Sequence, residues 1–254
     1  MQQVILYVVT IALLTCCSDN ASNNGLMSQE QSNNIKSYIA LERAKGKGVD
    51  VRGKFGANLS GMKLVNVDLS GIDFSGFNFS NVQISRGDFT KANLNGANLS
   101  GAIIQDSQFT ESALSSVNAV SANLQGSTFT KANLTQANFA SANLEDADFT
   151  EAIIEGADFS YAKITSGILR GVQGSRVNFR EIDMVGGMFE GAKLSDANFL
   201  GADLRKASFK GSDLSGSYFE SSDLTDADFT GCGLNGVDFT GAIGANAKGL
   251  VGAK

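Results

Sequence analysis

Residues 57–61 read Ala-Asn-Leu-Ser-Gly, and the pattern returns as Ala-Asn-Leu-Ser-Gly at 97–101 and as Ala-Asp-Phe-Ser-Tyr at 157–161. Outward from these segments, a large apolar residue recurs at almost every fifth position from Leu59 to Phe239. A period of five fits neither an α-helix, which repeats every 3.6 residues, nor a straight strand, which repeats every two. It fits a short extended stretch followed by a corner, so the pattern predicts a chain that coils and stacks on itself.

Phenylalanine and leucine alternate within this apolar series. Within the series, every Phe except Phe74 falls at a residue number ending in nine, and numbers ending in four hold mostly Leu or Ile. A ten-residue alternation gives uniform columns only when each coil has an even number of sides. We therefore predict square coils of twenty residues, about nine of them, in a rod of roughly 44 Å at 4.8 Å per coil.

The quoted units resemble the A-(D/N)-(L/F)-(S/T)-x repeats of the pentapeptide-repeat family. The resemblance implies an all-β fold, a right-handed quadrilateral parallel β-helix, over residues 57–241, and it leaves residues 242–254 as a C-terminal tail. That fold agrees with the even number of sides inferred from the Phe and Leu alternation.

A helix is predicted before the repeats, over residues 28–46. Ser28 and Gln31 have the spacing of a capping box, and Ile35 and Ile39 fall on one side. Because a solenoid needs its apolar ends covered, residues 28–56 are predicted to form an N-terminal capping helix and a lead-in to the first coil. A membrane-surface helix is the alternative, since Lys36, Arg43, Lys45 and Lys47 are basic.

An apolar run at residues 4–14 ends in Leu14-Thr15-Cys16-Cys17. The run is short for a bilayer span but suits the core of a signal peptide. An apolar core followed by Leu, small residues and Cys resembles a bacterial lipobox, whose cysteine is lipidated. We predict lipidation at Cys17, with Cys16 as the alternative, after a lipoprotein-type signal peptide at 1–16 and before a flexible tether at 17–27.

This interpretation places the protein in the cell envelope, lipid-anchored and facing the periplasm or the surface. The resemblance implies that the residues just after the lipidated cysteine sort such proteins between the two membranes. Because neither cysteine is followed directly by Asp, the outer membrane is favoured over the inner one. An uncleaved hydrophobic anchor is the alternative, since the residues before the apolar run include no Lys or Arg.

The composition bears on catalysis and on partners. The chain has no His, which removes the commonest general base and zinc ligand, and we expect no enzyme activity, no cofactor and no metal site. The formal net charge of −6 argues against direct binding of nucleic acid, which needs a basic surface.

Two sets of carboxylates are candidate interaction surfaces. Positions twenty residues apart should stack, which aligns Asp183, Asp203 and Asp223 in a column that could bind a cation or a basic partner, or cap backbone amides near the corners. A second set, the acidic belt, contains six acids and no base and is a candidate contact for a basic partner. Its members are Glu145, Asp146, Asp148, Glu151, Glu155 and Asp158.

Two further features stand out along the repeats. Asn58, Asn78 and Asn98 begin a column of asparagines, which we interpret as a structural ladder of hydrogen bonds. Gly174 falls at a position of the five-residue series where a large apolar residue is expected, so we expect that position to be empty. It lies in the least regular coil.

The function predicted from these observations is a non-enzymatic, envelope-anchored structural or protein-interaction module, with an unidentified protein partner and a monomeric state favoured. The alternative is a DNA mimic that binds DNA gyrase or topoisomerase, as some family members do. From residue 57 onward, 14 basic and 22 acidic residues leave a charge of −8. A duplex of the same length would carry about 26 negative charges, so the mimicry is poor.

Overall fold

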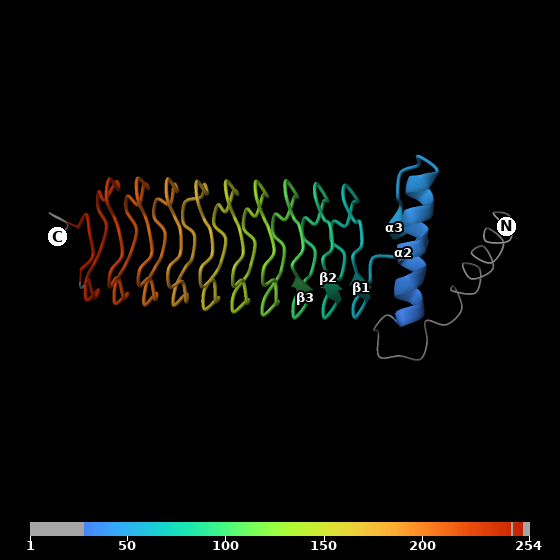
Figure 1. Ribbon diagram of the computed structural model, residues 1–254, viewed down its shortest axis with the longest axis horizontal. Helices are drawn as coiled ribbons and strands as arrows, with labels where there is room; N and C mark the ends of the chain where they lie inside the picture. The colour runs from blue at the N-terminus through green and yellow to red at the C-terminus, as the bar shows by residue number, and fades with distance from the viewer. Residues whose placement is uncertain (1–27, 245, 251–254) are drawn as a thin grey trace.

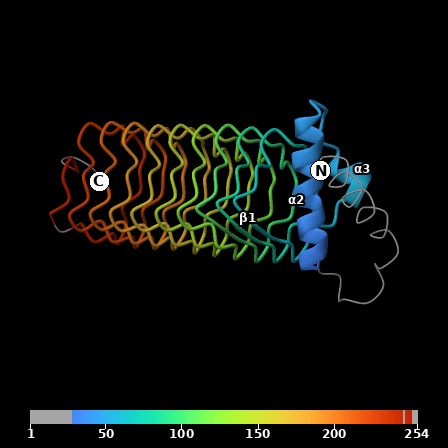
Figure 2. The ribbon, with the colours of Figure 1, turned by 45° about the vertical axis from the view of Figure 1, so that its right-hand side comes forward.

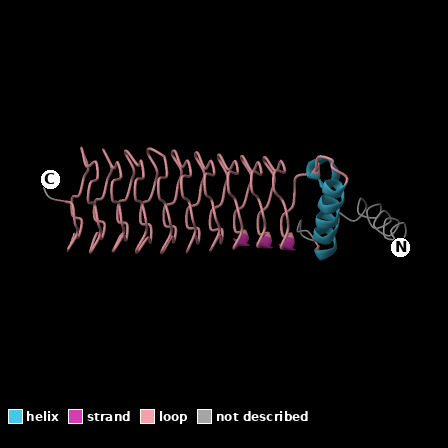
Figure 3. Cartoon of the chain, turned by 45° about the horizontal axis from the view of Figure 1, so that its top comes forward, coloured by secondary structure: helices cyan, strands magenta, loops and turns pink. Residues whose placement is uncertain are grey.

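The computed structural model describes residues 28–244 and 246–250, and it shows a rod of stacked coils with two helices at one end (Figure 1). The helices are α2 (Gln29–Ala44) and α3 (Val51–Phe55). Three short strands follow in successive coils, β1 (Lys63–Val65), β2 (Gln83–Ser85) and β3 (Ile103–Gln105). They pair in parallel and lie on one side of the rod, next to the helices (Figure 3).

The backbone pairs with a constant offset of twenty residues. The parallel bridges among the described residues run in four columns, which begin at Asn58, Lys63, Asp68 and Asp73. Because a coil returns to the same column after twenty residues and passes four columns on the way, each coil has four sides. The chain is therefore a β-solenoid, and the turned view shows its coils in regular succession (Figure 2).

The solenoid extends further than the sequence pattern indicated. Ile243 pairs with Asp223 and Lys248 pairs with Asp228, so the ladder continues past the predicted end at residue 241. The apolar series stops at Gly244, but ladder pairing uses backbone groups and continues without a large side chain. The ladder therefore continues through residues 242–244 and 246–248, beyond the boundary predicted at residue 241.

Each corner places one residue in the left-handed region of backbone conformation. Gly61, Asn66, Gly71 and Gly76 have φ of 71°, 50°, 63° and 62°. At the first of these corners the Met62 N–H donates to the Leu59 carbonyl, which closes a turn of type II character. Glycine suits this conformation, which explains its frequency at numbers ending in one and six.

Phenylalanine rings stack in two columns of the core, and Leu169 interrupts one of these columns between Phe149 and Phe189. Phe89, Phe109, Phe129 and Phe149 stack with centroids 4.7–4.8 Å apart. A second stack contains Phe139, Phe159, Phe179, Phe199 and Phe219. Where the two stacks meet, the rings contact edge to face at 5.6–6.5 Å. The Phe columns predicted from the ten-residue alternation are confirmed, and their buried rings fill much of the interior of the rod.

The helices cover the first coil with apolar side chains. The capping box at Ser28 and Gln31 is present, with the Gln31 N–H 3.2 Å from Ser28 Oγ and the Ser28 N–H 2.8 Å from Gln31 Oε1. Ile35 and Ile39 of α2 are 1% and 2% exposed and join the solenoid core together with Val51 of α3. The open apolar end of the first coil is thereby buried.

Basic side chains from the helices also cover the polar edge of the first coil. Lys36 Nζ donates to the Val65 carbonyl at 3.0 Å. The guanidinium groups donate in the same way, Arg43 to the Ser70 carbonyl and Arg52 to the Ser75 carbonyl.

These three carbonyls lie at successive corners. In the next coil the equivalent carbonyls of Ser85, Thr90 and Asn95 accept backbone N–H groups from the first coil. At the first coil, cationic side chains therefore donate the hydrogen bonds that backbone N–H groups donate further along the stack. Lys36 and Arg43, two of the basic residues on which the membrane-surface alternative rests, thus face the solenoid.

Candidate interaction surfaces

The asparagine column is a hydrogen-bonded ladder. The Asn78 amide donates to Asn58 Oδ1 at 3.0 Å, and Asn98 donates to Asn78 at 3.3 Å. Each Oδ1 also accepts the backbone N–H two residues later, as Asn98 does from Ser100 at 3.1 Å. The interpretation as a structural ladder is confirmed, because the same carboxamide oxygen ties one coil to the next and supports a corner.

The aspartates at 183, 203 and 223 stack in one column, and Arg205 lies among them. Their backbones pair in parallel, Asp183 with Asp203 and Asp203 with Asp223. The Arg205 guanidinium is 2.6 Å from Asp203 Oδ2 and 3.9 Å from Asp223 Oδ2. Hydrogen bonds from Arg205 hold the pKa of Asp203 below its ordinary value, and Asp203 raises the pKa of Arg205 in return. The positive charge of Arg205 therefore partly neutralises the negative charge of the aspartate column.

The same column supports its corners. Asp223 Oδ1 accepts both the N–H and the hydroxyl of Thr225, at 3.0 and 2.6 Å. Thr165 Oγ1 lies 3.5 Å from Asp183 Oδ1. Among residues 28–244 and 246–250, no group of three or more His, Cys, Asp or Glu side chains is arranged to hold a metal ion. The geometry therefore fits amide capping better than cation binding.

The acidic belt does not gather on one side of the rod. Its residues wind around the coil, because each side takes only five residues. Three of its carboxylates face a base from a neighbouring coil. Glu145 Oε1 lies 2.8 Å from Lys163 Nζ, and Glu151 Oε2 lies 3.6 Å from Lys131 Nζ.

The third belt carboxylate with a basic partner is Glu155. Its oxygens accept the Ser175 N–H at 2.7 Å and Arg176 Nη2 at 3.0 Å. The Ser175 amide first, and then Arg176, hold the pKa of Glu155 below its ordinary value. Glu155 therefore binds to the next coil and is not free for a partner.

The remaining belt aspartates support local structure. Asp148 Oδ1 accepts the Thr150 N–H at 2.8 Å, and Asp158 Oδ1 accepts the Asn178 amide at 2.9 Å. Asp146 occupies a corner with φ of 56° and is exposed. The six carboxylates therefore do not make a continuous acidic patch.

The Gly174 position is occupied by backbone. A Cβ on Gly174 would lie 2.8 Å from both the Glu155 nitrogen and the Ile154 carbonyl carbon. A side chain at position 174 would therefore collide with the preceding coil, so the position is closed to a large apolar residue rather than left as an empty space.

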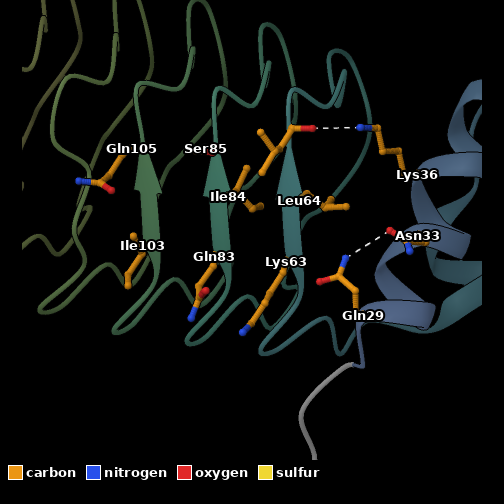
Figure 4. Close-up of a pocket in the computed structure, with 11 residues that line it drawn as sticks. Gln29, Asn33, Lys36, Lys63, Leu64, Gln83, Ile84, Ser85, Ile103 and Gln105 are labelled. Carbon is orange, nitrogen blue, oxygen red and sulfur yellow. Dashed lines mark hydrogen bonds between the residues drawn. The ribbon is translucent and has the colours of Figure 1, made fainter.

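Sequence reasoning missed a groove between α2 and the three strands. It has a volume of about 510 Å³. Two rows of outward side chains flank it on the solenoid, Lys63, Gln83 and Ile103 in one row and Val65, Ser85 and Gln105 in the other (Figure 4). The first turns of α2 close one end with Gln29, Asn33 and Lys36. No pattern in the sequence predicts this groove, because the groove forms only where α2 lies against strands β1–β3.

The described repeats match the sequence models of known repeat proteins over most of the chain. The model described as "Pentapeptide repeat region" matches residues 102–184 and 182–248. The model described as "Pentapeptide repeats (8 copies)" matches residues 55–90 and 78–115. The chain belongs to the pentapeptide-repeat family.

Solved pentapeptide-repeat proteins resemble the chain in structure. HetL, a pentapeptide repeat protein involved in heterocyst differentiation regulation from the cyanobacterium Nostoc sp. strain PCC 7120, is 29% identical with a TM-score of 0.50, over 82% of this chain and 92% of HetL. A trypsin-treated form of QnrB1, a plasmid-mediated fluoroquinolone resistance protein, is 22% identical with a TM-score of 0.44, over 69% of this chain and 91% of QnrB1. No curated protein sequence matches this pentapeptide-repeat chain.

The predicted signal peptide, the tether and both candidate lipidation residues, Cys16 and Cys17, lie outside the described residues. Within the part of the chain that the structure describes, no helix has the length and apolar character to cross a bilayer.

Proposed function

We propose that this pentapeptide-repeat protein is a non-enzymatic interaction module held at the cell envelope by a lipid on Cys17 or Cys16. The observation that carries the interaction role is that the backbone hydrogen bonds and the apolar core of the solenoid are made within the solenoid itself. Its backbone groups pair along the stack and its core is filled, so outward side chains and the groove beside α2 are left to contact a partner. A rigid rod of this kind loses little conformational entropy when a partner binds to its surface.

The charged residues support a non-catalytic role. An acid–base or nucleophilic site needs side chains that converge on a substrate. The belt carboxylates instead bond to neighbouring coils, as Glu145 does with Lys163 and Glu155 with Arg176.

We further propose that the coils wind to the right, number about nine at 4.8 Å each, and use α2 as the N-terminal cap. The burial of Ile35 and Ile39 and the hydrogen bond from Lys36 to the first coil support the capping role.

Metabolic labelling with a lipid precursor, followed by cell fractionation, tests the anchor. We expect the wild-type chain to carry the label and to sediment with the outer membrane. A double variant, Cys16→Ala with Cys17→Ala, should lose both, and the two single variants should identify the lipidated cysteine. Unlabelled wild-type protein in the cytosol would refute envelope anchoring and would favour the DNA-mimic alternative, which a gyrase supercoiling assay then tests.

A further inference from the structure

The groove between α2 and strands β1–β3 combines concavity, exposed apolar surface and hydrogen-bond donors. Val65 and Ile103 are 48% and 41% exposed and lie on opposite rows of the groove. They are two of the six large hydrophobic side chains that are exposed among residues 28–244 and 246–250. A concave surface with apolar contacts and a few polar groups is the usual form of a binding site.

The charged side chains of the groove have one sign. Lys36 and Lys63 line it, and no Asp or Glu does. Lys36 spends one of its three N–H donors on the Val65 carbonyl, which leaves two for a ligand. Arg86 follows the lining residue Ser85 at the corner after β2, but it does not line the groove, and its Nε donates to Asn66 Oδ1 at 2.7 Å.

Carboxamide groups supply the remaining polarity. Gln83 and Gln105 belong to neighbouring strands and stand on opposite rows (Figure 4). A carboxamide both donates and accepts hydrogen bonds, as a peptide group does, so such side chains suit the main chain of an extended peptide. The strands offer no open edge beside the groove. β2 pairs with both β1 and β3, and α2 covers the other edge of β1, where the Lys63 N–H donates to Ser32 Oγ and the Val65 carbonyl accepts from Lys36. Recognition must therefore proceed through side chains and not through an added strand.

We propose that this groove binds an extended acidic peptide segment of a partner protein. The proposal rests on the interaction role given above and assigns it to one site. Lys36 and Lys63 would pair with carboxylates of the segment, Gln83 and Gln105 with its main chain, and Val65 and Ile103 with its apolar side chains. Charge complementarity excludes a basic segment, and the −8 charge from residue 57 onward disfavours a long polyanion such as nucleic acid.

Fluorescence anisotropy with three labelled octapeptides tests the proposal on the purified full chain. The peptides alternate Val with Glu, Lys or Ser. We expect the Glu peptide to bind more tightly than the other two, and the difference should shrink as salt is raised from about 0.05 to about 0.5 M.

Two substitutions locate the site, each with a matched control on another face. Lys63→Glu should weaken binding of the Glu peptide about three- to ten-fold and improve binding of the Lys peptide, whereas Lys193→Glu makes the same charge change outside the groove and should have little effect. Ile103→Gln should weaken binding, whereas Ile153→Gln, at an equally exposed 44% site, should not. All four side chains are exposed, so the variants should fold.

The proposal is overturned if the three peptides bind equally, if none binds, or if the control substitutions weaken binding as much as the groove substitutions. None of these outcomes touches lipid labelling or fractionation. A failed peptide assay with a labelled, membrane-bound chain therefore refutes the groove alone, and peptide binding by an unlabelled cytosolic chain refutes the anchor alone.

Discussion

Truncation of Ile39 to alanine should detach the helical end of the solenoid while the rest of the rod stays folded. Ile39 is 2% exposed and packs with Ile35 against the first coil. The change removes three carbons, about 2.4 kcal/mol at about 0.8 kcal/mol per buried carbon. The cavity left behind adds to this cost, so we expect a loss of about 3 kcal/mol in the stability of the segment.

Hydrogen exchange measured by mass spectrometry would follow this loss along the chain. Because each coil of a solenoid contacts only its neighbours, faster exchange should be confined to α2, α3 and the first coil. Ile104→Ala is the matched control, since Ile104 is 0% exposed but lies inside the ladder at β3. It should loosen the coils around residue 104 and leave α2 protected. Unchanged exchange in the first coil of the Ile39→Ala variant would refute the capping argument, as would an equal loss of protection along the whole rod.

Three further predictions concern the solenoid itself. Gly174→Leu restores the apolar series of the sequence, yet it should lower the unfolding free energy in urea by about 2 kcal/mol, because its Cβ would meet the backbone of the preceding coil. Asn98→Ala should cost about 1–2 kcal/mol in the same assay, since it removes two ladder hydrogen bonds and the support of a corner amide. Hydrogen bonds from Thr230, and then Lys210, lower the pKa of Asp228 to about 2. Its contribution to stability should therefore be complete above about pH 4 and be lost as the pH falls toward 2, and Asp228→Asn should remove that part of the pH dependence.

A specific outcome would contradict each of these three predictions. A Gly174→Leu variant at least as stable as wild type would mean that the coil has room for a side chain there. An Asn98→Ala variant with unchanged stability would show that the ladder bonds add nothing beyond those made to water. An Asp228→Asn variant whose stability falls with acid as steeply as wild type would show that other carboxylates carry the effect.

The core and its columns follow from the sequence because they depend on local spacing alone. Five residues make one side and one corner, so the alternation of Phe and Leu predicts which rings stack without knowledge of distant contacts. The ladder pairs of Asn58, Asn78 and Asn98 follow from the same period. The end of the ladder did not follow, since the pattern ends at Gly244 while backbone pairing at Lys248 needs no large side chain.

The candidate surfaces were harder to predict, because outward side chains form hydrogen bonds and ion pairs with side chains of other coils. The acidic belt is continuous in sequence but is distributed around the coil, and bases from other coils pair with three of its six carboxylates, as Lys163 does with Glu145. The aspartate column was placed correctly by the twenty-residue offset, but the guanidinium of Arg205 among its carboxylates depends on a side-chain conformation that the repeat does not encode.

The sequence by itself determined the β-solenoid, its square section and its Phe stacks. The period of five predicts a side and a corner, and the alternation of Phe and Leu predicts an even number of sides and the rings that stack. Only the tertiary structure decided what happens where the period ends. There α2 lies across the first coil, three cationic side chains take the place of missing backbone donors, and a groove opens between helix and ladder. These features depend on contacts between a helix and coils that are distant in sequence, and such contacts follow from shape and charge in three dimensions.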